Sequence, residues 1–104
     1  MATGHDPWRA ESRRQVKVLV ELCSFENVVY ELTYTINVSR RGARILSKDC
    51  WNANQRLSVR SIEGSLNSDA RIAYCHPTEG GTYAIGLELA QPSNGWDLPY
   101  QQST

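Results

Sequence analysis

Short runs of alternating apolar and polar residues constrain the fold of this chain more than any other feature. A period of two is typical of strands with one face in a core and the other toward water. Runs of this kind predict six strands, which lie at about 16–22, 28–39, 43–47, 55–62, 69–75 and 82–89. No run of ten or more residues has the helical period. Because closing a sheet removes its exposed edges, we expect an all-β fold, a six-stranded antiparallel barrel.

The alternation also predicts which side chains point inward. In the first strand these are Val16, Val18, Val20 and Leu22. In the second strand the apolar set is Val28, Tyr30, Leu32, Tyr34, Ile36 and Val38, and the outer, wet face is Glu31, Thr33, Thr35, Asn37 and Ser39. The same reasoning assigns Tyr74 and Tyr83 to the core. Trp51 and Trp96 are expected to be apolar plugs at the barrel ends.

The length of 104 residues suits a single domain. We expect a flexible N-terminal segment at 1–14, the barrel at 15–91 and a C-terminal tail at 92–104, which is broken by turn residues. The N-terminus does not resemble a signal peptide, and no stretch is long enough to span a membrane. Three cysteines without metal-like spacing predict free thiols, and the expected location is cytoplasmic.

Arginine is concentrated in two places although the formal net charge is zero. Neutrality argues against a general nucleic-acid binder held by bulk positive charge. The clustered residues are Arg9, Arg13, Arg14, Arg40, Arg41 and Arg44. This distribution indicates a local anion site, and the alternative is a solvated arginine face with scattered acidic partners.

Two motifs contain most of these arginines. The first is Arg9-Ala-Glu-Ser-Arg13, and the second is Asn37-Val38-Ser39-Arg40-Arg41-Gly42, which begins 24 positions after Arg13. Read as RxxxR followed by NxSxxG, the pair resembles the ligand signature of PilZ domains, bacterial β-barrel receptors for cyclic di-GMP. The resemblance extends from about Arg9 to Leu89 and includes the last two strands around the Gly80-Gly81 turn.

The resemblance implies cyclic di-GMP as the ligand, without another cofactor or a metal, and it implies ligand contacts at Arg9, Arg13, Arg14, Asn37, Ser39 and Gly42. An arginine fork can grip a guanine edge, stack on a base or pair with phosphate. Asn37 offers an acceptor and a donor, Ser39 can bind phosphate or its own backbone, and Gly42 permits close approach.

Each of these assignments has a structural alternative. Arg9 and Arg13 could belong to a charged linker, Arg14 could be a surface charge, and Asn37 could shape the strand end. Arg40 and Arg41 are variable motif positions that could add phosphate attraction. Trp8 could stack on a base or cover a barrel end.

The leading functional hypothesis is a receptor module that binds cyclic di-GMP and presents a changed surface to a protein partner. The alternative is a barrel that docks a partner without a ligand. A small barrel for single-stranded nucleic acid fits less well with zero net charge. An enzyme is not expected, because the sequence shows no pattern of a nucleophile with its base, of paired carboxylates or of a metal cluster.

Overall fold

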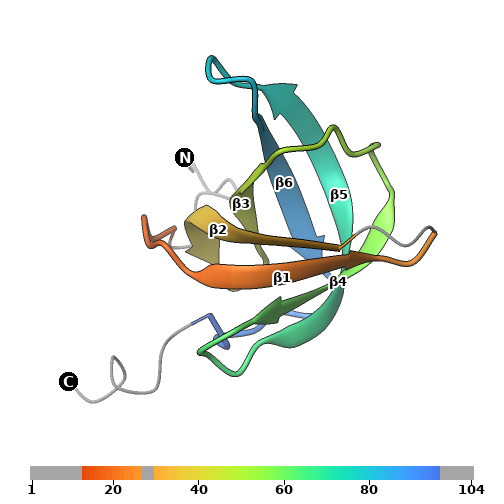
Figure 1. Cartoon of the computed structure of the whole chain (residues 1–104). Coiled ribbons are helices and arrows are strands. Elements are labelled where there is room, and N and C mark those ends of the chain that lie inside the picture. The colour runs from red at the N-terminus through yellow and green to blue at the C-terminus, as the bar shows by residue number, and fades with distance from the viewer. Residues whose placement is uncertain (1–12, 27–29, 97–104) are drawn as a thin grey trace, which may run out of the picture.

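The protein forms a closed barrel of six antiparallel strands (Figure 1), as seen in a computed structural model that describes residues 13–26 and 30–96. The strands are β1 (Leu19–Ser24), β2 (Tyr30–Ser39), β3 (Gly42–Ser47), β4 (Arg56–Ser61), β5 (Asn67–Pro77) and β6 (Tyr83–Leu89). Around the barrel their order is β1-β2-β3-β6-β5-β4. The predicted fold class and the six strands are therefore confirmed, and no helix occurs among the residues described.

The core contains the apolar side chains that alternate along five of the strands. Fully buried examples are Val20, Leu22, Ile45, Leu57, Val59, Ile72 and Ile85. Trp51 and Trp96 lie at opposite ends of the barrel. The Trp51 indole donates to Ser47 Oγ, 3.0 Å away at the end of β3, whereas the Trp96 indole donates to the carbonyl of Ser39, 2.8 Å away just before β3 begins. Both indoles are buried, as expected for plugs at the two ends.

The second strand departs from the expected pattern. Its apolar side chains from Tyr30 to Ile36 face outward, with Tyr30 57% exposed and Leu32 52% exposed. Tyr34 and Ile36 are also exposed, while Glu31 and Thr35 are buried. The prediction that these four apolar side chains lie in the core is wrong. Val38 is fully buried as predicted, and Val28 lies outside the described residues.

A β-bulge explains why one strand combines both patterns. Thr35 is opposite Ile45 and Asn37 is opposite Arg44, so Ile36 is an extra residue without its own partner on β3. The insertion shifts the alternation by one residue, because side chains reverse faces at every position. Asn37 therefore faces outward and Val38 inward, while before the bulge Thr35 and Glu31 face inward.

The buried polar groups of β2 are hydrogen-bonded. The Glu31 carboxylate accepts from Ser47 Oγ at 2.7 Å and from the Lys48 amide at 2.9 Å. The Thr35 hydroxyl accepts from the Val18 amide at 2.8 Å and donates to the Val16 carbonyl at 2.6 Å. These bonds offset the cost of removing polar groups from water and connect β2 to the neighbouring chain segments.

The fifth strand also has a register shift, between Ile72 and Tyr74. A Cβ added to Gly86, which is opposite Tyr74, would overlap the tyrosine ring. Since Gly86 lies between the inward-facing Ile85 and Leu87, the ring of Tyr74 covers the outer side of β6. The predicted core position of Tyr74 is therefore wrong, and its half-buried ring stacks on His76 with 4.7 Å between centroids. Tyr83 is half-buried.

The segments that flank the strands pack against the barrel. Arg14 forms an antiparallel bridge with Val38, with both backbone N–O distances at 2.9 Å. At the other end, the amide of Ser93 donates to the Arg40 carbonyl at 2.7 Å, and the Gly95 carbonyl accepts from Ser65 and Leu66. The core therefore extends to Trp96, beyond the last strand.

Candidate functional site: two motifs on the outside of the barrel

The two sequence motifs meet at the bulge of β2. Nη1 of Arg13 donates to Oδ1 of Asn37 at 2.7 Å, although the residues are 24 positions apart. The backbone bridge between Arg14 and Val38 holds the N-terminal segment beside β2, so Arg13 is positioned by main-chain bonds. Arg13 is exposed and Asn37 is half-buried, which leaves the pair accessible from solvent.

Ser39 is not on the wet outer surface where the strand pattern placed it. The side chain is 6% exposed, because residues 93–96 cross over the β2–β3 turn. Its Oγ accepts from the Arg41 amide at 3.3 Å and lies 3.5 Å from the carbonyl oxygen of Gly42. Ser39 thus folds back on its own backbone and shapes the turn.

Gly42 begins β3 at a point of close contact with β6. A Cβ at this position would overlap the carbonyl oxygen of Leu87. Gly42 is opposite Ser39 on one side and Glu88 on the other. The missing side chain therefore allows β2, β3 and β6 to approach one another at the motif turn. The variable residues of that turn, Arg40 and Arg41, are exposed.

A row of outward-facing residues continues from Asn37 across the sheet. Asn37 is opposite Arg44, Arg44 is opposite Gly86, and Gly86 is opposite Tyr74. Arg44 is exposed, and the ring of Tyr74 lies beyond the bare backbone of Gly86. From sequence, Arg44 was included in the arginine cluster but not among the expected ligand contacts, and Tyr74 was assigned to the core. The concentration of arginine near the second motif was a signal for Arg44, whereas the bulge in β5 concealed the position of Tyr74.

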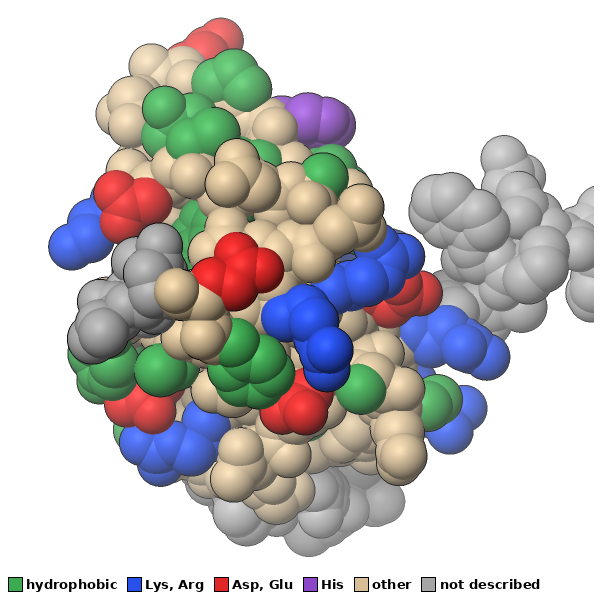
Figure 2. Space-filling model, turned by 90° about the vertical axis from the view of Figure 1, so that its right-hand side faces the viewer, with side chains coloured by type: hydrophobic (Ala, Val, Ile, Leu, Met, Phe, Trp, Pro, Cys, Tyr) green, Lys and Arg blue, Asp and Glu red, His purple; other side chains and the backbone are tan. Residues whose placement is uncertain are grey.

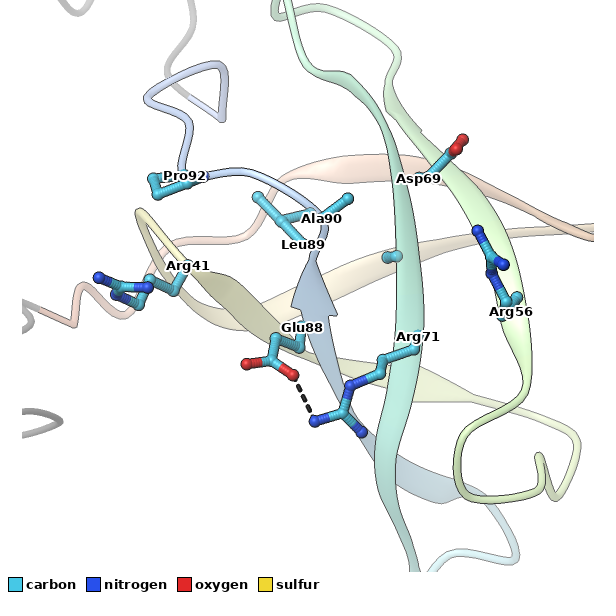
Figure 3. A pocket seen from close by; sticks show the side chains of 9 residues that line it. Arg41, Arg56, Asp69, Arg71, Glu88, Leu89, Ala90 and Pro92 are labelled. Atoms are coloured by element: carbon cyan, nitrogen blue, oxygen red, sulfur yellow. Dashed lines mark ion pairs between the residues drawn. The ribbon is translucent and has the colours of Figure 1, made fainter.

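An open pocket of about 380 Å³ lies beside the motif turn. Arg41 borders it on one side, and Arg56, Arg71 and Glu88 come from the outer faces of β4, β5 and β6 (Figure 3). Arg71 forms an ion pair with Glu88 and donates to Oδ1 of Asn54 at 3.0 Å. The pocket therefore contains an arginine held in one position next to the second motif.

Charges of both signs are intermixed on the face of the molecule shown in Figure 2. Among the described residues, Arg60 and Glu21 form an ion pair at 3.1 Å. The hydrogen bond from Arg60 lowers the pKa of the Glu21 carboxyl, and the hydrogen bond to Glu21 raises the pKa of the Tyr30 phenol. The face shown in Figure 2 therefore carries no single-sign field of the kind that attracts polyanions.

Two predicted site residues, Trp8 and Arg9, lie outside the described residues, so the first motif is described only at Arg13. The described residues contain no group of three or more His, Cys, Asp or Glu side chains that could hold a metal ion. They also contain no helix that could cross a membrane.

Comparison with known proteins agrees with the architecture. The Bacillus subtilis inhibitor of motility (MotI/DgrA) has a similar structure, with a TM-score of 0.63 and 14% sequence identity. The match covers 82% of this chain and 44% of that protein, and at this identity it supports the fold alone. No curated protein sequence matches the chain. The family model for the PilZ domain matches residues 8–95, which include both motifs and all six strands, and the chain therefore belongs to the PilZ domain family.

Proposed function

We propose that this barrel is a receptor module for cyclic di-GMP, and that ligand binding changes the surface it presents to a protein partner. The observation that carries the proposal is the hydrogen bond between Arg13 and Asn37. It brings the two motifs to one accessible place on the barrel wall. Membership of the PilZ family supports the same ligand.

The chemistry of this place suits a guanine nucleotide. The guanidinium of Arg13 offers several donors in one planar cationic group, so it can pair with phosphate or with O6 and N7 of guanine. Asn37 adds an amide that can donate and accept on a base edge. The exposed guanidinium of Arg44 lies in the adjacent strand and adds positive charge beside Asn37.

Ligand binding would have to compete with the bond that joins the motifs. In the structure described here, Oδ1 of Asn37 accepts from Arg13. A guanine that uses the same atoms must share or replace this bond, so the position of the N-terminal segment depends on the ligand. Such a local rearrangement is a recognised means of switching a surface.

Isothermal titration calorimetry with cyclic di-GMP tests this function, and separate titrations with GMP and cyclic di-AMP serve as comparisons. We expect selective binding of cyclic di-GMP by the parent protein. Arg60→Ala is a suitable control variant, because Arg60 is also an exposed arginine with a hydrogen-bonded partner but belongs to neither motif. Absence of heat with cyclic di-GMP from a folded barrel would contradict the proposal.

A ligand-free docking module is a second candidate, and the outer face of β2 favours it. Tyr30, Leu32, Tyr34 and Ile36 form an exposed apolar stripe, and Leu46 on β3 is exposed beside it. A row of neighbouring exposed apolar side chains is typical of protein contact sites. If calorimetry detects no ligand, this stripe becomes the main functional surface, and Leu32→Lys should remove association with the partner without unfolding the barrel.

A further inference from the structure

Two of the three cysteine thiols face each other at one end of the barrel. Cys50 Sγ and Cys75 Sγ are 3.8 Å apart, although the residues are separated by 25 positions. Cys50 lies in the loop after β3 and is exposed, whereas Cys75 lies in β5 and is half-buried. Cys23, on β1, is also free and exposed.

The loop that carries Cys50 is bound to β5 by the main chain. The Asn54 amide donates to the Ile72 carbonyl at 2.7 Å, and the Ile72 amide donates to the Gln55 carbonyl at 2.9 Å. Next to Cys50, the buried indole of Trp51 is hydrogen-bonded to Ser47. These contacts hold both sulfur atoms near each other, so a bond between them requires only a local adjustment of two side chains and the exposed end of the loop.

The bulge in β5 contributes to this arrangement. Because the register shifts between Ile72 and Tyr74, Tyr74 lies on the outer surface and Cys75 packs against the core. Burial raises the pKa of the Cys75 thiol, which keeps it protonated and slow to react with an external reagent. Within this pair, the exposed Cys50 is therefore the thiol that a dissolved oxidant meets first.

We propose that Cys50 and Cys75 form a reversible dithiol–disulfide site, oxidised by a peroxide and reduced by a dithiol. In the first step the sulfur of Cys50 attacks one peroxide oxygen, the O–O bond breaks, and Cys50 sulfenic acid and water are formed. In the second step the sulfur of Cys75 attacks the Cys50 sulfur, the S–O bond breaks, and a second water leaves with the proton of the Cys75 thiol. The protein loses two hydrogens overall, and the peroxide is reduced to water.

The experiment treats the reduced full-length chain with stepwise amounts of hydrogen peroxide, then alkylates the remaining thiols in denaturant and measures the intact mass. The intact mass should correspond to a monomer with one alkyl group. Digestion of this product should place the alkyl group on Cys23 and yield a pair of peptides linked between Cys50 and Cys75. Dithiothreitol should restore three alkylated cysteines. The oxidised protein should also melt higher, by roughly 5 °C or more, because the link restricts the unfolded chain.

Cysteine variants provide matched controls. Cys23→Ser should form the linkage as the parent does, whereas Cys50→Ser and Cys75→Ser should each lose it. In Cys75→Ser, the sulfenic acid at Cys50 should persist and react with dimedone. The proposal is overturned if peroxide converts Cys50 to sulfinic acid while Cys75 of the parent remains alkylated, or if the main product is a dimer linked through Cys23.

Discussion

Arg13 is the side chain through which the two motifs meet. Its bond to Asn37 is exposed, and exposed polar contacts add little to folding stability. For Arg13→Ala we expect a loss of cyclic di-GMP affinity of roughly 2–5 kcal/mol, typical of truncating one member of a charged contact that the bound ligand buries. The free energy of unfolding should change by no more than about 0.5 kcal/mol. Calorimetry and urea denaturation on the same sample measure the two quantities, and unchanged affinity would remove Arg13 from the site.

Substitutions at Asn37 test the chemistry of the second motif. Asn37→Ala should weaken binding by about 1–3 kcal/mol, the usual value of a bidentate base contact, and stability by roughly 0–1 kcal/mol. Asn37→Asp retains the acceptor for Arg13, adds a second, and should bind at least as well as the parent. If both variants melt lower and neither changes affinity selectively, Asn37 only shapes the strand.

Individual site residues could be predicted from sequence to different extents. The family motif identified Arg13 and Asn37, and the structure brings these two together. The burial of Ser39 could not be foreseen, because it depends on a segment more than fifty residues later in the chain. The outward position of Tyr74 depends on a register shift that alternation alone does not reveal.

Strand β2 shows why regular alternation is an incomplete guide to an element. Regular alternation gave the correct faces for Val38 and Asn37 and the wrong faces for Ile36 and for the apolar residues before it, back to Tyr30. The bulge adds one residue and so turns Thr35 and Glu31 toward the core. Burial of the Thr35 hydroxyl and the Glu31 carboxylate costs little stability, because both groups are hydrogen-bonded. No extra residue of a bulge lies on β1, β4 or β6. In these strands the apolar residues expected inside are buried, apart from Val16 and Tyr83, which are partly buried.

Thr35 should be the residue on which this region of β2 depends most. In Thr35→Val the buried amide of Val18 and the partly buried carbonyl of Val16 lose the hydroxyl that bonds them. We expect a loss of about 1–3 kcal/mol in the free energy of unfolding, the usual cost of unsatisfied buried groups. Thr33→Val is the matched control, because the Thr33 hydroxyl is bonded to Leu46 where water has access. Equal midpoints in urea for the two variants would show that the hydroxyl of Thr35 is dispensable.

The N-terminal segment should be separable from the barrel. Deletion of residues 1–13 retains the Arg14–Val38 bridge and every core residue identified within 13–26 and 30–96. We expect a cooperative thermal transition and no cyclic di-GMP binding. Deletion of residues 1–7 keeps Trp8, Arg9 and Arg13 and should retain affinity. A chain that fails to fold without residues 1–13 would make this segment part of the structure itself.

For the whole molecule, the segment after β6 completes the core. Trp96 is 1% exposed and joins residues 93–96 to the β2–β3 turn. Trp96→Ala should lower the free energy of unfolding by about 3–5 kcal/mol, the range for large aromatic side chains removed from a core. That is a large part of the stability of a domain of this size. Ile62→Ala, at an exposed apolar position, should cost less than about 1.5 kcal/mol by the same urea measurement, because that value is the lower limit for a fully buried aliphatic side chain.

The contact between Gly42 and Leu87 has a consequence for how the second motif is used to recognise related proteins. Any side chain at residue 42 would separate β3 from β6, whether or not a nucleotide is bound. A PilZ barrel that lost its ligand during evolution would still be under selection to keep this glycine, while the residues at positions 13 and 37 would be free to vary. We therefore expect the glycine to report that a barrel of this shape can close, and the arginine and asparagine to be the more informative markers of a receptor.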